Sequence, residues 1–473
     1  MSETLLDVVI IGGGTAGLAA LRDVKKHTEH FVIIDDGKWS TTCARVGCMP
    51  SKALIEAANA YHRRHTLDTF GVRGGEALRI DVPAVLARVR ALRDGFVAGV
   101  RQAIEGLGDR AIDGRATIVA LDRVEVNGRR LQTRQIIVAT GSQPIVPAPW
   151  RALGDRLLTS DSLFEQPDLP ARIAVIGMGA IGAEMAQALS RLGIEVTGFD
   201  ATERLAGLSD PIVNDALLAA LRSEFRVHLG APATAALHDD GSVRVSNGRE
   251  EVRVDAVLVA LGRRPDLASL GFGVLGVELG ARGVPKVDPT TMRVGRLPVF
   301  LVGDANAEVP LLHEAADEGH IAALVATDAG AGPFQRRVPI SIVFCDPDVA
   351  VVGKRFSQLE TSGTITGEYH FEHQGRARMA QRNRGALRIY AARDSGLLLG
   401  AELCAPSGEH LAHLLALAIE RELTVHDLLR MPFYHPVIEE GVRSALRELS
   451  SRLPPCAKSD LAACEPIGVD ALE

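Results

Sequence analysis

Two cysteines stand five positions apart in the stretch WSTTCARVGCMPSK, which runs from Trp39 to Lys52. On a regular helix, residues five apart are separated by about 7.5 Å along the axis and point about 140° apart. That separation exceeds the ~7 Å limit that a disulfide sets on two Cα atoms. Cys43 and Cys48 can therefore act as a redox couple only if the chain between them is irregular, which Gly47 permits.

The residues after the second cysteine favour redox chemistry. Pro50 is placed to open a helix beside Cys48, and a helix N-terminus lowers the pKa of a thiol. Lys52 adds a positive charge one turn further on, so the stretch predicts a reducible disulfide with one thiolate-prone member. Zinc is a weaker interpretation, because the nearby His62 and His65 lack a partner Cys-x-x-Cys. Two unrelated buried cysteines are the remaining alternative.

A glycine pattern occurs twice. VVIIGGGTAGLAA carries G-x-G-x-x-G spacing directly after an apolar run, and IAVIGMGAIGAEMA repeats it. The first glycine makes the tight turn, the second lets a pyrophosphate approach the backbone, and the third lets the helix pack on the strand. The glycines of the two copies are Gly12, Gly14 and Gly17, then Gly177, Gly179 and Gly182.

Each copy is followed, at the same offset, by an acid that closes a second apolar run. These acids are Asp35 in FVIID and Asp200 in VTGFD, where a carboxylate binds ribose hydroxyls. The double match predicts two dinucleotide-binding domains. Asp200 also repels the 2′-phosphate of NADP and is followed by Ala201, so we expect NAD, with Arg204 as the feature that argues for NADP.

Composition limits the remaining classes. The chain has 473 residues, a net charge of −7 and six cysteines. The negative net charge argues against binding to nucleic acid or to an anionic membrane, because both attract positively charged surfaces. The apolar run near the N-terminus ends in glycines and has no basic flank, so it predicts a buried strand rather than a signal peptide. We expect a cytoplasmic protein with reduced thiols and without membrane spans or a metal site.

The order of the elements predicts an α/β fold of several domains. Apolar runs alternate with helical segments up to about residue 335, and hairpin turns are predicted at Asn127-Gly128, Asp240-Gly241 and Asn247-Gly248. From about residue 338 the pattern changes to several strands followed by the helical segment GEHLAHLLALAIERE, which indicates a separate α+β domain. The last segment, 453–473, predicts an extended tail.

These motifs together resemble the flavin-dependent pyridine nucleotide–disulfide oxidoreductases, and most closely the dihydrolipoamide dehydrogenases. The likeness covers nearly the whole chain and rests on both fingerprints, TCARVGCMPSK, VATGSQP, ALGRRPD, FLVGDA, PLLHEAADEG and YHPVIEEG. It implies two Rossmann-like domains and a C-terminal dimerisation domain. The implied boundaries are 1–148 with 267–335 for FAD, 149–266 for NAD and 336–452 for a homodimer interface with shared active sites.

The resemblance also implies the cofactor-binding residues. The ADP half of FAD would be held by Gly12, Gly14, Gly17 and Asp35, and the rest of FAD by Lys52, Gly141, Gly303 and Asp304. The nicotinamide dinucleotide would be held by Gly177, Gly179, Gly182, Asp200 and Gly262. Lys52 would lie beside the flavin N5 and pair with Glu184.

The catalytic residues follow from the same resemblance. Cys48 would lie against the isoalloxazine as the charge-transfer thiolate, while Cys43 exchanges with the substrate. His435 would be the acid–base, contributed by the other subunit and oriented by Glu440, with Glu439 as the rival partner. The spacing places Pro436 in the first turn of a helix that contains Glu440.

The chain departs from the family pattern around these residues. Ser40-Thr41 replaces the usual Gly-Gly, Arg45 the usual Asn, Phe433 a His and Val437 a Thr. Arg45 adds a positive charge that could change the thiolate balance. Three functions therefore stay open. The first is oxidation of dihydrolipoamide with NAD beside a lipoyl-domain partner, and the second is NAD(P)H-dependent reduction of a glutathione-type disulfide or of mercuric ion. The third is a slow-turnover flavoprotein that serves as a redox sensor or complex subunit.

Four further cysteines lie outside the motif. Cys345 and Cys404 stand in apolar strand contexts and are expected to be packed thiols. Cys456 and Cys464 stand in the tail, where spare exposed thiols are the simpler interpretation and an electron relay the other.

Overall fold

The computed structural model describes residues 5–328 and 330–454. These residues divide into two compact units. The first takes in the chain up to Ala57, then Asp81–Pro170 and Leu258–Arg336. The second takes in Ala58–Ile80, Ala171–Val257 and the chain from Arg337 onward. The two glycine fingerprints therefore lie in different units.

The first unit is built on a sheet whose strand order is β3-β2-β1-β6-β5-β4, with β17 also paired to β6. β1 (Leu6–Ile11) pairs in parallel with β2 (Phe31–Asp35) and with β6 (Arg129–Val138). Successive side chains of a strand point to opposite faces. Val8 and Ile10 thus enter one buried cluster, and Val9 and Ile11 enter another on the other face. Both faces are covered, which is why β1 is continuously apolar from Val8 to Ile11.

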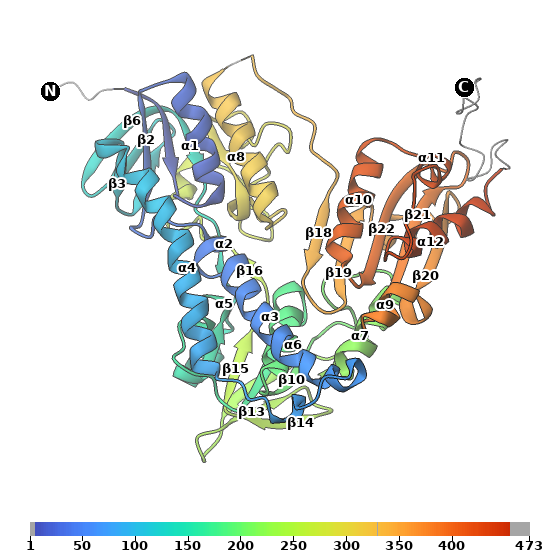
Figure 1. Ribbon diagram of the computed structural model, residues 1–473. Coiled ribbons are helices and arrows are strands. Elements are labelled where there is room, and N and C mark those ends of the chain that lie inside the picture. Colours follow the sequence, from blue (N-terminus) through green and yellow to red (C-terminus); the bar gives the residue numbers. More distant parts are fainter. Residues whose placement is uncertain (1–4, 329, 455–473) are drawn as a thin grey trace. The chain divides into compact units, whose positions relative to one another are not determined.

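Two helices cover one face of this sheet and pack unusually closely. α1 (Thr15–His27) lies beside α8 (Leu312–Thr327), as Figure 1 shows. A Cβ placed at Gly319 of α8 would lie 2.1 Å from the carbonyl oxygen of Ala16 in α1. Only glycine allows that approach, so α8 holds the helix of the first fingerprint in place.

The other elements of the first unit have these bounds: α2 Thr42–Arg45, α3 Cys48–His62, α4 Val82–Glu105, β3 Ala111–Asp113, β4 Ala116–Ala120, β5 Arg123–Val126, β7 Gln143–Pro144, β8 Leu157–Thr159, α5 Ser160–Leu163, β16 Arg263–Arg264 and β17 Val299–Leu301. The last residues of α3, from Ala58 on, belong to the second unit.

The second unit contains the second fingerprint. β9 (Arg172–Ile176) pairs in parallel with β10 (Glu195–Phe199), and β10 pairs with β11 (Arg226–His228). α6 (Ala180–Arg191) follows β9, and α7 (Pro211–Arg222) follows β10. An antiparallel sheet adds β12 (Thr234–Leu237), β13 (Val243–Ser246) and β14 (Glu251–Val254), after which β15 (Ala256–Val259) leads out of the unit.

The C-terminal part of the second unit is an antiparallel sheet of order β18-β19-β22-β21-β20. Helices α10 and α12 pack on it, and leucines of α10, α11 and α12 join its buried core. The bounds are β18 Ile340–Val343, β19 Asp348–Gly353, β20 Thr364–His370, α9 Gly375–Met379, β21 Ala386–Ala392, β22 Leu398–Ala405, α10 Gly408–Glu420, α11 Val425–Leu429 and α12 Glu440–Ser450.

Buried polar contacts join the two parts of the second unit. Asp210, at the start of α7, accepts hydrogen bonds from the hydroxyl of Tyr390 (2.9 Å) and from Nε of Arg388 (3.1 Å). Glu402 accepts the backbone N–H groups of Ser209 and Asp210, each at 2.8 Å. Both carboxylates are fully buried, and a buried carboxylate must be hydrogen-bonded or paired to be tolerated. These contacts explain why residues 171–257 form one unit with the C-terminal sheet.

The predicted fold class is confirmed: two Rossmann-type segments and a C-terminal α+β segment are present. The three predicted hairpin turns are confirmed too, each lying between paired antiparallel strands. The domain boundaries at 148, 266 and 335 stay predictions. Residues 455–473 of the predicted tail, with Cys456 and Cys464, lie outside the described residues. Within residues 5–328 and 330–454, no helix is long and apolar enough to cross a membrane.

Candidate active site

The two fingerprints fold in the same way. Each runs from a parallel strand through a glycine turn into a helix, with Gly12 at φ +111° and Gly177 at φ +96°. A side chain is strained at such angles. At Gly12 a Cβ would also lie 2.3 Å from the carbonyl oxygen of Ala139, and at Gly17 it would lie 1.9 Å from that of Gly12. These glycines are therefore required by the protein's own packing.

The acid of each fingerprint is tied to its glycine turn by the same hydrogen bond. Asp35 accepts the backbone N–H of Gly13 at 2.9 Å, and Asp200 accepts that of Met178 at 2.6 Å. Both acceptors stand at the carboxyl end of the second strand, beside the turn. The same hydrogen bond therefore occurs in both fingerprints. It holds each carboxylate at the position that binds ribose hydroxyls in a dinucleotide-binding fold.

The middle glycine of each turn has a different reason to be glycine. A Cβ at Gly14 or at Gly179 would meet no protein atom within 4 Å, and neither residue has a positive φ. The protein alone would accept a side chain there. Space left open beside the N-terminus of a long helix is what a bound pyrophosphate requires. The two turns therefore fit the ADP halves of two dinucleotides.

A polar network surrounds Asp304, one of the other predicted FAD residues of the first unit. Gly141, at φ +69°, precedes Ser142, whose hydroxyl donates to Asp304 at 2.6 Å. Arg263 donates to Ser142 at 3.1 Å and to Asp161 at 2.7 Å. Sequence reasoning missed Ser142 and Arg263, although both stand inside the quoted motifs VATGSQP and ALGRRPD.

Gly303 is held by the helix that follows it. Its backbone N–H donates to Glu318 at 2.7 Å, and Arg336 pairs with Glu318 at 3.3 Å. Burial raises the pKa of Glu318 despite these partners. Gly262 lies in the first unit, where its carbonyl accepts the N–H of Ile145. Its predicted contact with NAD stays a prediction.

The cysteine stretch has the predicted irregular path. α2 ends at Arg45, and α3 begins at Cys48, so Val46 and Gly47 break the helix between the two thiols. A Cβ at Gly47 would approach the carbonyl oxygen of Thr42 to 3.0 Å, which makes glycine the residue that fits the break. Pro50 lies in the first turn of α3, as expected.

Cys43 and Cys48 are free thiols that interact with each other. The hydrogen bond to Cys48 raises the pKa of the Cys43 thiol, and burial raises it further. The positive charge of Lys52 acts in the opposite direction and lowers that pKa. Cys43 is therefore the member of the pair whose pKa is raised, and Cys48 stands at the helix N-terminus, a position that stabilises a thiolate.

His435 and Glu440 form a hydrogen-bonded pair, with Nδ1 of His435 lying 2.9 Å from Oε1 of Glu440. The His435 side chain is 81% exposed, so its ring is open to a partner from outside the chain. The structure pairs it with Glu440 and not with the rival Glu439. The bond fixes the ring orientation and leaves Nε2 free to exchange a proton.

The expectation that Pro436 opens a helix is wrong. α12 begins at Glu440, and the chain before it is irregular, with a cis peptide bond at His435-Pro436. Side chains hold this segment instead: Glu440 accepts the N–H of Val437 at 3.3 Å, and Gln374 donates to the Val437 carbonyl at 2.7 Å. These bonds replace the helical pattern, so His435 lies on a braced loop.

Glu184 stands on α6 and is 7% exposed. It accepts the N–H of Phe344 at 2.8 Å, and one and two turns further along α6 Gln187 and Arg191 bind Asp346. Arg191 also donates to Asn59 of α3 at 2.5 Å. This polar face of α6 fixes Glu184. Its pairing with Lys52, which lies in the other unit, stays a prediction.

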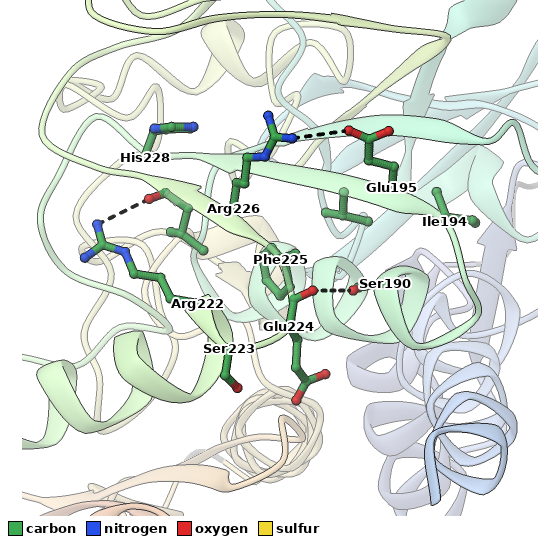
Figure 2. A pocket seen from close by; sticks show the side chains of 11 residues that line it. Ser190, Ile194, Glu195, Arg222, Ser223, Glu224, Phe225, Arg226 and His228 are labelled. Carbon is green, nitrogen blue, oxygen red and sulfur yellow. Dashed lines mark hydrogen bonds and ion pairs between the residues drawn. The ribbon is translucent and has the colours of Figure 1, made fainter. Parts of the chain in front are cut away.

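A cavity of about 650 Å³ lies in the second unit, beside β10 and β11 (Figure 2). Its wall includes Arg222, Arg226, Glu195 and His228. Ser190 and Glu224 line it too, and the hydroxyl of Ser190 donates to the backbone carbonyl of Glu224. None of the residues predicted for catalysis or cofactor binding lines it. Within the described ranges, no group of three His, Cys, Asp or Glu side chains could hold a metal ion.

A sequence model of the pyridine nucleotide-disulphide oxidoreductases matches residues 6–319. The chain belongs to this family. A second model, that of the pyridine nucleotide-disulphide oxidoreductase dimerisation domain, matches residues 339–446. As a pyridine nucleotide-disulphide oxidoreductase, the protein is a flavoprotein that uses FAD and NAD(P), and the glycine turns described above fit both.

Proteins named dihydrolipoyl dehydrogenase are similar to this chain over almost its whole length. The dihydrolipoyl dehydrogenase of Pseudomonas aeruginosa is 29% identical over 96% of this chain and 100% of its own length. Dihydrolipoyl dehydrogenase 3 of Haloarcula marismortui is 27% identical over 93% of this chain and 96% of its own. These relatives support a place close to the dihydrolipoamide dehydrogenases within the pyridine nucleotide-disulphide oxidoreductases.

Two solved structures share the fold. LpdA from Mycobacterium tuberculosis has a TM-score of 0.81 at 26% identity, covering 93% of this chain and 99% of its own. The HOCl-induced flavoprotein disulfide reductase RclA from Escherichia coli has a TM-score of 0.80 at 23% identity, with coverage of 93% and 99%. The fold of this chain is therefore that of the flavoprotein disulfide reductases.

Proposed function

We propose that this protein oxidises a dihydrolipoamide-type dithiol with NAD and works as a homodimer. The observation that carries the proposal is the interacting pair of Cys43 in α2 and Cys48 at the start of α3, in a chain that also positions an exposed His–Glu pair. The relatives named dihydrolipoyl dehydrogenase, at 27% and 29% identity, support the choice of dithiol. Bound FAD supplies the two-electron link between thiols and nicotinamide.

The Cys43–Cys48 pair, in its oxidised disulfide form, accepts two electrons from the dithiol substrate. A substrate thiolate attacks Sγ of Cys43, which breaks the Cys43–Cys48 bond and leaves Cys48 as the thiolate. The second substrate thiolate then attacks the substrate sulfur of the mixed disulfide and releases Cys43. The substrate leaves as a disulfide, and two electrons remain on the cysteine pair.

His435 keeps proton transfer in step with this exchange. Each attack needs a thiolate, so a base must accept the proton of the incoming thiol. Nε2 of His435 is the accepting atom, because Nδ1 is engaged by Glu440. The ring is 81% exposed in its own chain, and we place it at the thiol pair of the other subunit. The matched dimerisation domain supports this arrangement.

We assign NAD rather than NADP to the second fingerprint. Asp200 is held beside the turn by Met178 and by the N–H of Thr202 at 2.8 Å. A fixed carboxylate at this position accepts a ribose hydroxyl and repels a 2′-phosphate. A lipoyl-domain protein of a 2-oxoacid dehydrogenase complex is the partner that this activity would serve.

A second candidate is the NAD(P)H-dependent reduction of another disulfide. Ser40, Thr41 and Arg45 replace the usual residues around Cys43, and Nε of Arg45 is buried without a hydrogen-bond partner in the described part of the chain. The positive charge of the half-buried Arg45, two residues after Cys43, favours a disulfide substrate that carries a carboxylate, such as a glutathione-type disulfide.

Steady-state assays decide between the two. We would measure the oxidation of dihydrolipoamide with NAD and with NADP, then the reduction of lipoamide, glutathione disulfide and mercuric ion with NADH and with NADPH. We expect the lipoamide pair with NAD(H) to give the highest kcat/KM, and the Cys48→Ser variant to lose it. Cys404→Ala is the matched control, because Cys404 is a fully buried thiol outside the site. Preference for NADPH with glutathione disulfide would contradict the proposal.

A further inference from the structure

Gln187 follows Glu184 by one turn of α6 and is almost fully buried, with an exposed fraction of 3%. Its amide oxygen accepts the N–H of Asp346 at 2.8 Å, and its amide nitrogen donates to the carbonyl of the same residue at 2.9 Å. The nitrogen also donates to the carboxylate of Glu224 at 3.0 Å. One side chain therefore binds both backbone polar groups of Asp346.

The segment that Gln187 binds also holds Glu184. Two residues before Asp346, the N–H of Phe344 donates to Oε1 of Glu184 at 2.8 Å. Residues 344–346 lie between the end of β18 and the start of β19, outside the regular hydrogen bonds of the sheet. Backbone polar groups that leave a sheet need other partners, and side chains of α6 supply them here. The position of the Phe344 N–H therefore depends on the side chains that bind Asp346.

Ion pairs strengthen the hold on Asp346. Its carboxylate lies 3.1 Å from Nη1 of Arg191, four residues after Gln187 on α6, and 3.0 Å from Nη2 of Arg382. Burial acts to raise the pKa of Asp346, but the positive charges of Arg382 and Arg191 lower it below its usual value. Asp346 is thus bound to α6 through its N–H, its carbonyl and its carboxylate.

We propose that Gln187 is a positioning residue for Glu184. Gln187 fixes Asp346, Asp346 fixes the short segment that carries the Phe344 N–H, and this N–H fixes the carboxylate of Glu184. The inference rests on the proposed function, in which Glu184 would pair with Lys52 beside the bound flavin. It adds that the hydride step, which passes two electrons and one proton from NADH to the flavin, depends on a side chain that touches neither.

The Gln187→Leu variant tests the contact in the flavin-free chain, because leucine has a similar volume but cannot bind Asp346. Amide hydrogen exchange in the peptide that contains Phe344 and Asp346 should become about tenfold faster, since the second N–H loses its acceptor and the first its fixed position. Ser190→Ala is the matched control. It removes another side-chain hydrogen bond of α6, to the carbonyl of Glu224, and should leave this exchange unchanged.

The reaction of the holoenzyme with NADH shows what the position of Glu184 contributes. The limiting rate at which NADH bleaches the flavin absorbance should fall by about tenfold in Gln187→Leu, because a carboxylate displaced by a few tenths of an ångström is misaligned. The NADH concentration that gives half of this rate should stay within about twofold of wild type. Reduction of the cysteine pair by dihydrolipoamide involves no hydride and should also stay within about twofold.

The outcomes distinguish this inference from the proposed function. Unchanged hydrogen exchange, a limiting rate with NADH within about twofold of wild type, or equal losses in both reactions would overturn the role of Gln187. A wild-type enzyme that is reduced by NADH but not by dihydrolipoamide would instead contradict the proposed dithiol substrate and leave the NADH measurement valid.

A second variant keeps the test decisive if Gln187→Leu does not fold. Asp346→Asn keeps the shape of the residue but weakens its ion pairs with Arg191 and Arg382. It should speed the same hydrogen exchange and slow the limiting rate with NADH, each by about threefold. No change in either measurement would then overturn the inference.

Discussion

Asp348 at the start of β19 and Glu409 in α10 form a pair of neighbouring acids, and we expect the stability of the protein to depend on the proton that Asp348 holds. Asp348 is 8% exposed, accepts the N–H of Gly408 at 3.0 Å, and hydrogen-bonds to Glu409. Burial raises the pKa of Asp348 to about 9, and the bond to Glu409 and its charge contribute. The same bond lowers the pKa of Glu409. Folding therefore keeps Asp348 protonated and Glu409 ionised.

The size of the effect follows from proton linkage. An aspartate in the unfolded chain titrates near pKa ~3.9, so between about pH 4 and 9 the folded state holds one more proton at Asp348. The stabilisation is complete below about pH 4 and is lost as the pH rises toward 9. The loss is about 1.4 kcal/mol per pH unit, or about 3 kcal/mol between roughly pH 5.5 and 8. Glu409 is ionised in both states over this range and adds no slope.

The Asp348→Asn variant removes the titration while it keeps the shape and the two hydrogen bonds, because the amide can accept from Gly408 and donate to Glu409. Its free energy of unfolding, from urea denaturation, should rise relative to wild type by about 3 kcal/mol between roughly pH 5.5 and 8. Asp239→Asn, which changes an exposed acid of the same unit, should show no such trend. If the free energies of unfolding of wild type and Asp348→Asn changed in parallel with pH, Asp348 would not hold an extra proton in the folded state.

Three further outcomes are expected. Glu440→Gln should lower kcat/KM for the dithiol by about 100-fold, because the histidine loses the carboxylate that orients it, whereas Glu368→Gln, which alters an exposed His–Glu pair outside the site, should leave it unchanged. In a chain whose tail cysteines are replaced, a disulfide reagent should modify Cys43 and Cys48 and leave Cys345 and Cys404 untouched until unfolding, because the last two are buried out of reach of the reagent. Labelled peptides identified by mass spectrometry check this. Asp200→Asn should reduce the preference for NAD over NADP by about tenfold in kcat/KM, because the charge that repels the 2′-phosphate is gone.

Features that depend on nearby residues could be read from the sequence. The two glycine turns are specified by backbone angles and close contacts that glycine alone allows, as at Gly12 and Gly17. The break between Cys43 and Cys48 followed from helix geometry, and α3 begins at Cys48 as that reasoning requires. The fold class came from apolar runs and their spacing. All of these are properties of short segments, where the constraint and the residues that satisfy it are close in the chain.

Partners that are distant in the chain were decided by the tertiary structure. The sequence predicted that a helix starts at Pro436, but α12 begins at Glu440. Gln374, far away in sequence, binds the carbonyl of Val437 in the irregular segment between them. Asp210 and Glu402 are buried together with partners on other strands, which joins the second nucleotide segment to the C-terminal sheet. A periodic pattern shows that a side chain is buried but not what it meets there.

The sequence by itself therefore determined the two dinucleotide turns and predicted the kind of chemistry from a cysteine couple and a histidine. The tertiary structure decided the contacts: Cys48 as the hydrogen-bond partner of Cys43, Glu440 as the partner of His435, and Ser40 as a hydroxyl without a partner among the described residues. The physical reason is that pKa values and hydrogen bonds depend on distances of a few ångströms, which folding fixes between residues that the sequence keeps far apart.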